Sequence, residues 1–578
     1  EKPIPMQFKQ SCPRPLKGCL CLLLLVPGFT ISISAQTTYL NPGDKAYVLI
    51  ERMEILGQND SVLNFSKTRP FSRKEIIPAV ERYVSIGDSF VSTRVQGINL
   101  SRVDMHNVAS LYAANPEWSQ RQFTSKKAIG RFYRNPANLY EVHVKDFDLV
   151  INPIIQFQYL KESDNDESLF LNSRGVGIRG RIANKIGFAA SIIDNQERDP
   201  EYVQAWENKY QSVPGAGYYK NFKGTGFDYF DARGYFTFNV TKYIDVAFGY
   251  DRNFIGNGYR SLFLSDFSNN TLFLKLNTRI WKINYQNLFM ELHQTEPRGP
   301  DRLLRKKYAV FHHLDVNVTK KLNIGLFEGV MFGRSNRFEF GYLNPVIFYR
   351  SIEQQNGSFD NSVAGVDFKL NTLKQVQLYG QFLLDEFNLK EIKNNNGWWA
   401  NKWGLQLGAK YINAFGIKNL DLQLEHNRVR PFTYSHRDSV ANYTHYNQPL
   451  AHPLGANFNE MIGILRYQPA PKWIILAKAM SWKQGLDTGS RSFGGNVFLP
   501  NVPPYRQGDY GYEIVSGIES KTRFSSLLLS YELKENMFVE GSLTHRKFDV
   551  PSNSAMSTST TVVAIGFRWN MHRRIFEF

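Results

Sequence analysis

Alternation of apolar and polar side chains, residue by residue, fills most of this chain from residue 139 onward. In 420–425, for example, leucines alternate with Asp421, Gln423 and Glu425. Successive side chains of a strand point to opposite faces, so each such segment predicts a β-strand with one apolar and one polar face. A soluble β-sandwich would show the same alternation, so the period alone does not decide the fold class.

The lengths of the connections between these strands decide it. Short connections are predicted at Asn184-Lys185, Thr241-Lys242, Thr278-Arg279, Thr319-Lys320, Asn371 to Lys374, Ala414 to Ile417, Ala470-Pro471 and Leu533 to Glu535. Between them lie long connections near 195–230, 253–269, 293–307, 332–360, 388–401, 428–459, 484–521 and 548–557. A transmembrane barrel separates short periplasmic turns from long extracellular loops in this way, whereas a sandwich has no reason to do so.

The hairpins therefore predict an all-β protein. With a first strand near 141–160 and a last strand near 558–569, they make a transmembrane antiparallel β-barrel of about eighteen strands over residues 139–578. The barrel must close, because an open edge in lipid would leave backbone groups unpaired. The residues after Trp569 are predicted to form a short periplasmic return.

Residues 36–125 differ from the barrel and predict a small helical region in the periplasm. Helices are expected at Pro42 to Glu54, Ser72 to Ser85 and Ser101 to Ala114. Ser72 with Glu75, and Ser101 with Asp104, have the spacing of helix-capping boxes. The region is expected to act as a plug or a stabilising cap.

Residues 6–35 predict a cleaved signal peptide, with a basic start, an apolar core from Leu20 to Val26 and a cleavage site before Gln36. All three cysteines of the chain, Cys12, Cys19 and Cys21, fall inside it. The mature protein would then have neither disulfides nor cysteine-ligated metals.

The formal net charge of +17 is spread over the whole chain. Such a charge suits an anionic membrane surface or an acidic polysaccharide. Nucleic acid is not expected as a partner, because no nucleic-acid-binding signature occurs. No cofactor or metal is predicted.

A set of charged residues lies on the polar side of the predicted strands and is expected to face the lumen, because an Arg or Lys facing lipid at the midplane costs roughly 2–4 kcal/mol. These residues either line a channel or pair with one another and fill it, and the sequence leaves both open. They are Arg179, Arg181, Arg233, Asp245, Asp251, Lys402, Lys410, Asp421 and Glu425.

The connection from Arg428 to Glu460 is rich in histidine and tyrosine. These side chains could hold a sugar chain by stacking and hydrogen bonding, or bind a metal, although their spacing matches no metal-ligand motif. The loop could also fold inward and satisfy its own polar groups. Neighbouring Ser435, His436 and Asp438 do not make a catalytic triad, and no GxSxG motif occurs, so no enzymatic activity is expected.

Several segments together resemble the Wzi-type capsule-assembly family of outer-membrane proteins. They are Gly341–Arg350 (GYLNPVIFYR), Gly357–Asn361 (GSFDN), Arg430–His436 (RPFTYSH), His445-Tyr446 and Pro449–Gly455 (PLAHPLG). Gly249–Arg260 (GYDRNFIGNGYR) and Gly566–Asn570 (GFRWN) resemble the branch of this family in Bacteroidota, which includes the gliding-motility protein RemB.

The resemblance implies an eighteen-stranded barrel, an N-terminal helical part and a role as a surface lectin for capsular or exopolysaccharide. The positions that it implies for polysaccharide binding are Asn344, Pro345, Asp360, Asn361, Tyr434, His436, His445, Tyr446 and His452.

The sequence thus predicts a non-enzymatic barrel in the outer membrane, in contact with membrane lipid, that binds and organises surface polysaccharide. Two alternatives remain. The protein could be a surface component of gliding motility, adhesion or secretion that acts through protein partners, or a diffusion or uptake channel.

Overall fold

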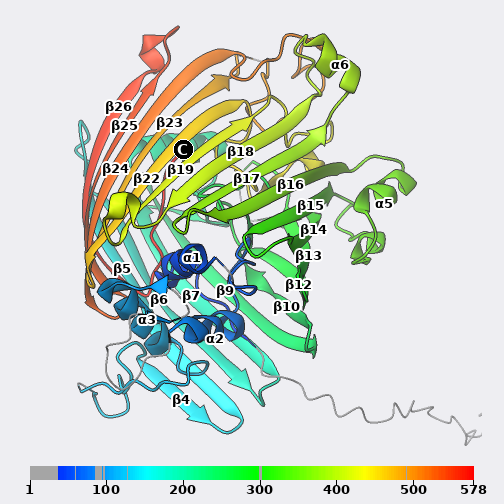
Figure 1. Cartoon of the computed structure of the whole chain (residues 1–578). Coiled ribbons are helices and arrows are strands. Elements are labelled where there is room, and N and C mark those ends of the chain that lie inside the picture. Colours follow the sequence, from blue (N-terminus) through cyan, green and yellow to red (C-terminus); the bar gives the residue numbers. More distant parts are fainter. Residues whose placement is uncertain are drawn as a thin grey trace, which may run out of the picture. The chain divides into compact units, whose positions relative to one another are not determined.

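The described part of the chain forms a closed antiparallel β-barrel of eighteen strands, which confirms the predicted fold class (Figure 1). The computed structural model describes residues 37–58, 60–84, 94–95, 98–126, 128–297, 302–489 and 491–578. The predicted signal peptide lies outside the described residues. Pairing of the last strand with the first closes the ring, with Val562 opposite Glu162 and Trp569 opposite Ile155.

The strands of the ring, in chain order, are β5 (Phe147–Glu162), β6 (Leu169–Ile182), β7 (Ile186–Arg198), β9 (Gly226–Thr241), β10 (Ile244–Asp251), β12 (Thr271–Ile280), β13 (Ile283–His293), β14 (Lys306–Asn317), β15 (Leu322–Phe332), β16 (Asn361–Thr372), β17 (Val376–Glu386), β18 (Lys402–Tyr411), β19 (Leu420–Val429), β22 (Phe458–Ala470), β23 (Trp473–Leu486), β24 (Ile518–Lys534), β25 (Met537–Asp549) and β26 (Thr558–Trp569).

Short strands lie outside the ring: β4 (Tyr140–Val144) pairs with β5, β8 (Lys220–Phe222) with β9, β1 (Thr68–Arg69) with β11 (Phe254–Ile255), β2 (Arg94–Val95) with β3 (Ile98–Asn99), and β20 (Thr444–His445) with β21 (Gln448–Pro449). The first strand predicted near 141–160 is thus two strands, because the chain reverses at 145–146 and β4 folds back on β5.

Most connections at one end of the ring are short and most at the other end are long, as predicted. The exceptions are 412–419 at the short-turn end, and 163–168 and 550–557 at the other end, which are of similar length. The strand bounds place the turn predicted at Thr278-Arg279 at 281–282 instead. Thr278 and Arg279 stay in the ladder opposite Tyr285 and Asn284, and Trp281 takes the left-handed turn position with a φ of 53°. The Trp-Lys pair at this turn has none of the Gly, Asn or Asp residues that usually indicate a hairpin.

The three predicted N-terminal helices are present as α1 (Ala46–Gly57), α2 (Arg73–Tyr83) and α3 (Arg102–Ala114). They share a core that includes Leu49, Met53, Ile77 and Val108. The capping box of Ser101 with Asp104 is confirmed. The box predicted at Ser72 is wrong, because the Ser72 hydroxyl donates to Oγ1 of Thr37 (3.0 Å) instead of capping α2. Within the described ranges, no helix is long and apolar enough to cross a membrane.

Ion pairs attach this helical region to the inner wall near the short turns. Nζ of Lys67 lies 3.2 Å from the carboxylate of Asp315, and Nζ of Lys369 lies 2.6 Å from that of Glu54 on α1. Lys45 forms an ion pair with Glu532 at the end of β24 (2.6 Å). The short-turn half of the barrel is therefore occupied by the helical region.

The other half of the barrel is filled by loops and by the end of the chain. Loops 252–270 and 430–457 fold inward, and the rings of Phe263 and Phe327 stack at 4.4 Å inside the wall. The segment 570–578 also runs inside, where Phe578 packs against Trp206 on α4 (Glu201–Tyr210). The short periplasmic return predicted for this segment is therefore wrong. Its charged and aromatic side chains find partners in the interior, such as the ion pair of Glu577 with Lys478 (2.6 Å).

Loop 333–360, which contains η1 (Phe340–Leu343) and α5 (Tyr349–Gln355), covers part of the outer face of the wall instead (Figure 1). On β15, Leu326 faces outward and is 52% exposed, whereas Val330 and Phe332 have the same orientation and are fully covered. They pack with Tyr342 and Tyr349 of this loop. The other long loops contain α6 (Leu389–Asn394), η3 (Ser439–Ala441) and η4 (Ser554–Met556), and one turn contains η2 (Ala414–Gly416).

Candidate functional site

Four of the charged residues predicted to face the lumen bind the N-terminal helical region. Nε of Arg179 lies 2.8 Å from the carboxylate of Glu117. Lys410 pairs with Glu51 and Asp421 with Arg52, and both of these partners are on α1. Asp245 pairs with Lys74 on α2, at 4.0 Å. These contacts join residues that are far apart in the sequence.

The remaining residues of that set find partners on the wall or in the loops. Arg181 pairs with Asp148, Arg233 with Asp231 and Asp251, and Lys402 with Asp385, while Glu425 accepts hydrogen bonds from the backbone of Tyr259 and Arg260. A buried charge is costly unless it is paired. The pairing corresponds to a filled lumen, the second of the two possibilities that the sequence leaves open.

The histidine- and tyrosine-rich loop lies inside the barrel mouth. Tyr434 donates to the carbonyl oxygen of Leu262 (2.8 Å) and is 2% exposed. His452 is fully buried, 2.7 Å from the carboxylate of Glu460. His436 and His445 are also buried, whereas Tyr446 is half-buried, with its ring 4.4 Å from that of His293. Most of these side chains therefore hold the loop in place and do not face solvent.

Burial lowers the pKa of His445 to about 3. It also lowers the pKa values of His436 and His452. These histidines are therefore neutral at physiological pH and add no positive charge for an acidic glycan.

The remaining positions implied by the resemblance lie in two other places. Asp360 accepts hydrogen bonds from Arg334 and Tyr342, each at 2.7 Å, and Asn361 donates to the carbonyl oxygen of Ala441 (2.9 Å). Asn344 and Pro345 belong to the loop on the outer face of the wall. The structure does not bring the nine positions together in one pocket.

An aromatic platform that sequence reasoning missed lies on the long loops. We use this name for Trp398, Trp399, Tyr505 and Tyr510. Loops 387–401 and 487–517 are joined by backbone hydrogen bonds, including the Trp399 amide to the Asp509 carbonyl oxygen (2.9 Å). Tyr510 is 55% exposed and Tyr505 38%.

A cationic side chain stacks on one member of this platform. The guanidinium of Arg506 lies 4.1 Å from the ring centroid of Trp399, and its Nε donates to the carbonyl oxygen of Asn501 (2.8 Å). Aromatic residues crowded into two neighbouring long loops, as in 398–399 and 505–512, are the sequence signal that could have indicated it.

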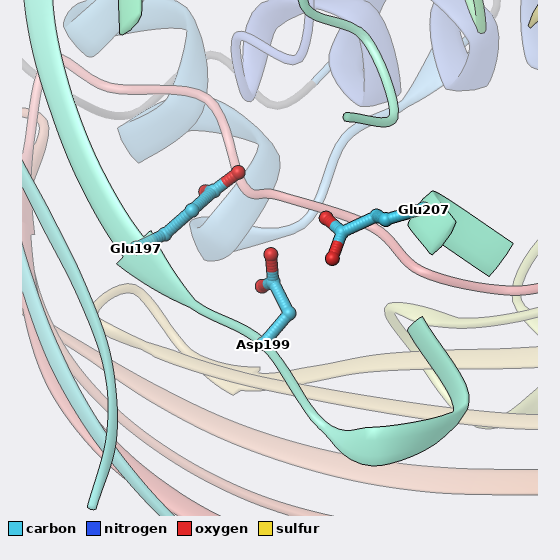
Figure 2. A group of neighbouring side chains, drawn as sticks. All are labelled: Glu197, Asp199 and Glu207. Atoms are coloured by element: carbon cyan, nitrogen blue, oxygen red, sulfur yellow. The ribbon is translucent and has the colours of Figure 1, made fainter. Parts of the chain in front are cut away.

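Three buried carboxylates form the one group in the described residues with the spacing of a metal site (Figure 2). Glu197 ends β7, Asp199 follows it, and Glu207 lies on α4; one oxygen of each lies within 4.8 Å of the others. Burial, and then the charge of Glu197, raises the pKa of Asp199. Burial, and then the charge of Asp199, raises the pKa of Glu207.

The closed barrel, its short and long connections and its filled interior define an outer-membrane β-barrel whose lumen is occupied by the protein itself. The family described as capsule assembly protein Wzi matches residues 232–560, more than half of the chain. The chain belongs to this family, and its location is the outer membrane.

A solved structure shows the same fold, and two further structures match less closely. Wzi of Escherichia coli, described as a carbohydrate-binding β-barrel involved in group 1 capsule assembly, has a TM-score of 0.56 at 14% identity, over 93% of this chain and 100% of that one. Pseudomonas aeruginosa OprD has a TM-score of 0.41 at 11% identity, over 74% of this chain and 97% of that one. Acinetobacter baumannii OccAB2 has a TM-score of 0.39 at 8% identity, over 73% of this chain and 98% of that one. No curated protein matches the chain.

Proposed function

We propose that this protein binds capsular or exopolysaccharide at the cell surface and helps to organise it, without catalysing a reaction. The observation that carries the proposal is the aromatic platform on the long loops, in which Tyr505 and Tyr510 are exposed and Trp398 and Trp399 half-buried, on a barrel whose lumen is filled. Membership of the capsule-assembly family supports it, as does the description of the Escherichia coli relative as carbohydrate-binding.

The chemistry of the platform suits a sugar chain. Tyrosine and tryptophan offer an apolar ring face together with a polar edge, so they can cover the apolar face of a sugar ring and hydrogen-bond its hydroxyl groups. Lys390 and Lys393 are exposed on α6 in the same loop as Trp398. Their charges would attract an acidic glycan, an effect that salt weakens.

Binding of the purified protein in detergent to an array of acidic and neutral bacterial glycans tests this proposal. We expect the double variant Tyr505→Ala, Tyr510→Ala to bind about tenfold more weakly, which corresponds to about 1.4 kcal/mol. Its unfolding temperature should stay that of the unchanged protein, since both side chains are exposed.

Tyr243→Ala is the matched control, because Tyr243 is 42% exposed in a turn at the short-turn end of the barrel. Failure of the unchanged protein to bind any glycan, or equal loss in the control, would overturn the proposal. A deletion strain with normal surface glycan but impaired surface movement or secretion would favour the alternative role through protein partners, including the gliding branch suggested by Gly249–Arg260.

A further inference from the structure

The group of Glu197, Asp199 and Glu207 is buried at the long-loop end of the barrel, apart from the aromatic platform. Figure 2 shows the three carboxyl groups converging from β7, the segment that follows it and α4. Glu197 already has partners, since it accepts from the Tyr229 hydroxyl (3.1 Å) and from Arg574 (2.8 Å).

The other two carboxylates lack such partners. Asp199 and Glu207 are each 1% exposed, and none of their four oxygens has a hydrogen-bond donor in the part of the chain that the structure describes. An ionised carboxylate can only accept hydrogen bonds. Two of them facing each other away from water therefore need either a shared proton or a cation between them.

The local charges favour a divalent cation. Around a bound cation all three carboxyl groups would be ionised, and three negative charges would stand against the one guanidinium of Arg574, which leaves two negative charges for the cation to balance. The donors are all carboxylate oxygens, the ligands that hard cations prefer, whereas zinc and copper sites favour nitrogen and sulfur. Calcium accepts irregular sets of oxygen ligands, and magnesium requires a near-octahedral arrangement.

We propose that Glu197, Asp199 and Glu207 form a structural calcium site. Bound calcium would tie α4 to the end of β7. Through the ion pair of Glu197 with Arg574, it would also tie both to segment 570–578. Trp206 of α4 packs against Phe578 of that segment, with ring centroids 5.2 Å apart, so the site would lock this part of the interior.

Full-length protein, refolded in a synthetic detergent without lipopolysaccharide and treated with EDTA, tests the proposal. We expect calcium chloride to raise its unfolding temperature by a few degrees, and titration calorimetry to show one site. Magnesium chloride at the same concentration should have a smaller effect. Since a shared proton would also satisfy the pair, the deciding variant is Glu207→Gln.

A glutamine at 207 can donate an amide hydrogen to Asp199 and thus replaces the shared proton, but it weakens a calcium site. For a calcium site we expect Glu207→Gln to lose the response to calcium, while its metal-free form is at least as stable as that of the unchanged protein. Glu167→Gln is the control, because Glu167 lies in the acidic loop 163–168 and is exposed.

An unchanged protein that does not respond to calcium overturns the proposal, and so does an equal response in Glu207→Gln. A stronger response to magnesium than to calcium overturns the assignment of the ion. Glycan binding is measured separately, so a failure of the calcium site and a failure of the lectin proposal are distinguishable.

Discussion

At the scale of single residues, His445 shows how the inward loop is held. Its Nδ1 accepts from the backbone N–H of His293 (3.0 Å), and its Nε2 faces the carbonyl oxygen of Asn270 (3.0 Å). Only the neutral imidazole with its hydrogen on Nε2 satisfies both contacts. The charges of His293 and Lys307 oppose protonation further.

Acid should therefore destabilise this loop. The pKa of His445 in the folded protein, about 3, lies below its ordinary value of 6.5. The unfolded chain binds this proton more readily, so stability is complete above pH 6.5 and is lost as the pH falls towards 3. Between pH 6.5 and 5 we expect the free energy of unfolding to fall by about 2 kcal/mol, measured by urea unfolding in detergent.

The variant His445→Gln keeps an Nε2 donor but cannot take up a proton, so the dependence of its stability on pH should be weaker. His545→Gln provides the comparison, because His545 is exposed. If His445→Gln and the unchanged protein lose stability equally in acid, the neutral state of His445 is not what links this loop to pH.

The sequence predicted the orientation of many interior residues but not their partners. Alternation indicates that Lys410 and Asp421 lie on the polar side of their strands, whereas Glu51 and Arg52 come from a helix more than 300 positions away. Similarly, the motif that contains Tyr434 indicated an unusual loop, but not that its hydroxyl would bind Leu262 inside the barrel. Such pairings depend on the closed ring and are absent from any local pattern.

At the scale of elements, strands were more predictable than loops. A strand can be recognised from its alternating side chains and from the length of the turn that follows it. For example, β26 begins and ends where the sequence predicted. The conformation of a loop depends on the surfaces against which it packs, and these come from distant parts of the chain. The sequence therefore did not decide whether loop 430–457 folds into the barrel or away from it. The position of loop 333–360 on the outer face was not predicted.

Loop 333–360 covers a polar row on the outer face of the wall. Asn287, His312 and Glu328 lie side by side on β13, β14 and β15 and are all buried. Glu328 accepts from the backbone amides of Tyr349 and Arg350, each at 2.9 Å. A carboxylate exposed to lipid near the middle of a membrane span costs about 3 kcal/mol.

Replacing 338–358 by a short Gly-Ser linker should therefore lower the stability of the barrel by about 3 kcal/mol, through exposure of Glu328 to lipid. The measurement is denaturant unfolding in lipid vesicles. In the same shortened chain, Asn287→Leu, His312→Leu and Glu328→Leu together should restore most of the loss. A shortened chain as stable as the full one, or no rescue, would show that the loop does not shield this row.

At the scale of the whole molecule, two separate obstructions lie in series along the lumen. The helical region fills the short-turn half, and loops 252–270 and 430–457 with segment 570–578 fill the other. Cavities beside the helices measure about 40 and 10 Å³, room for only a few water molecules. An eighteen-strand barrel without such obstructions would contain an aqueous channel.

Because obstructions in series each suffice to block current, removing either one should leave the barrel nearly closed. We expect little conductance in planar bilayers from the full protein, from a chain without 37–125, and from a chain in which 254–268 and 433–453 are replaced by short linkers and 571–578 is removed. Only the combined variant should conduct steadily, with Lys410 and Asp421 then lining hydrated space. The two single variants are the controls for each other. Steady current through the full protein would instead favour the channel alternative. Ions could cross the filled interior only if its ion pairs opened and water took their place.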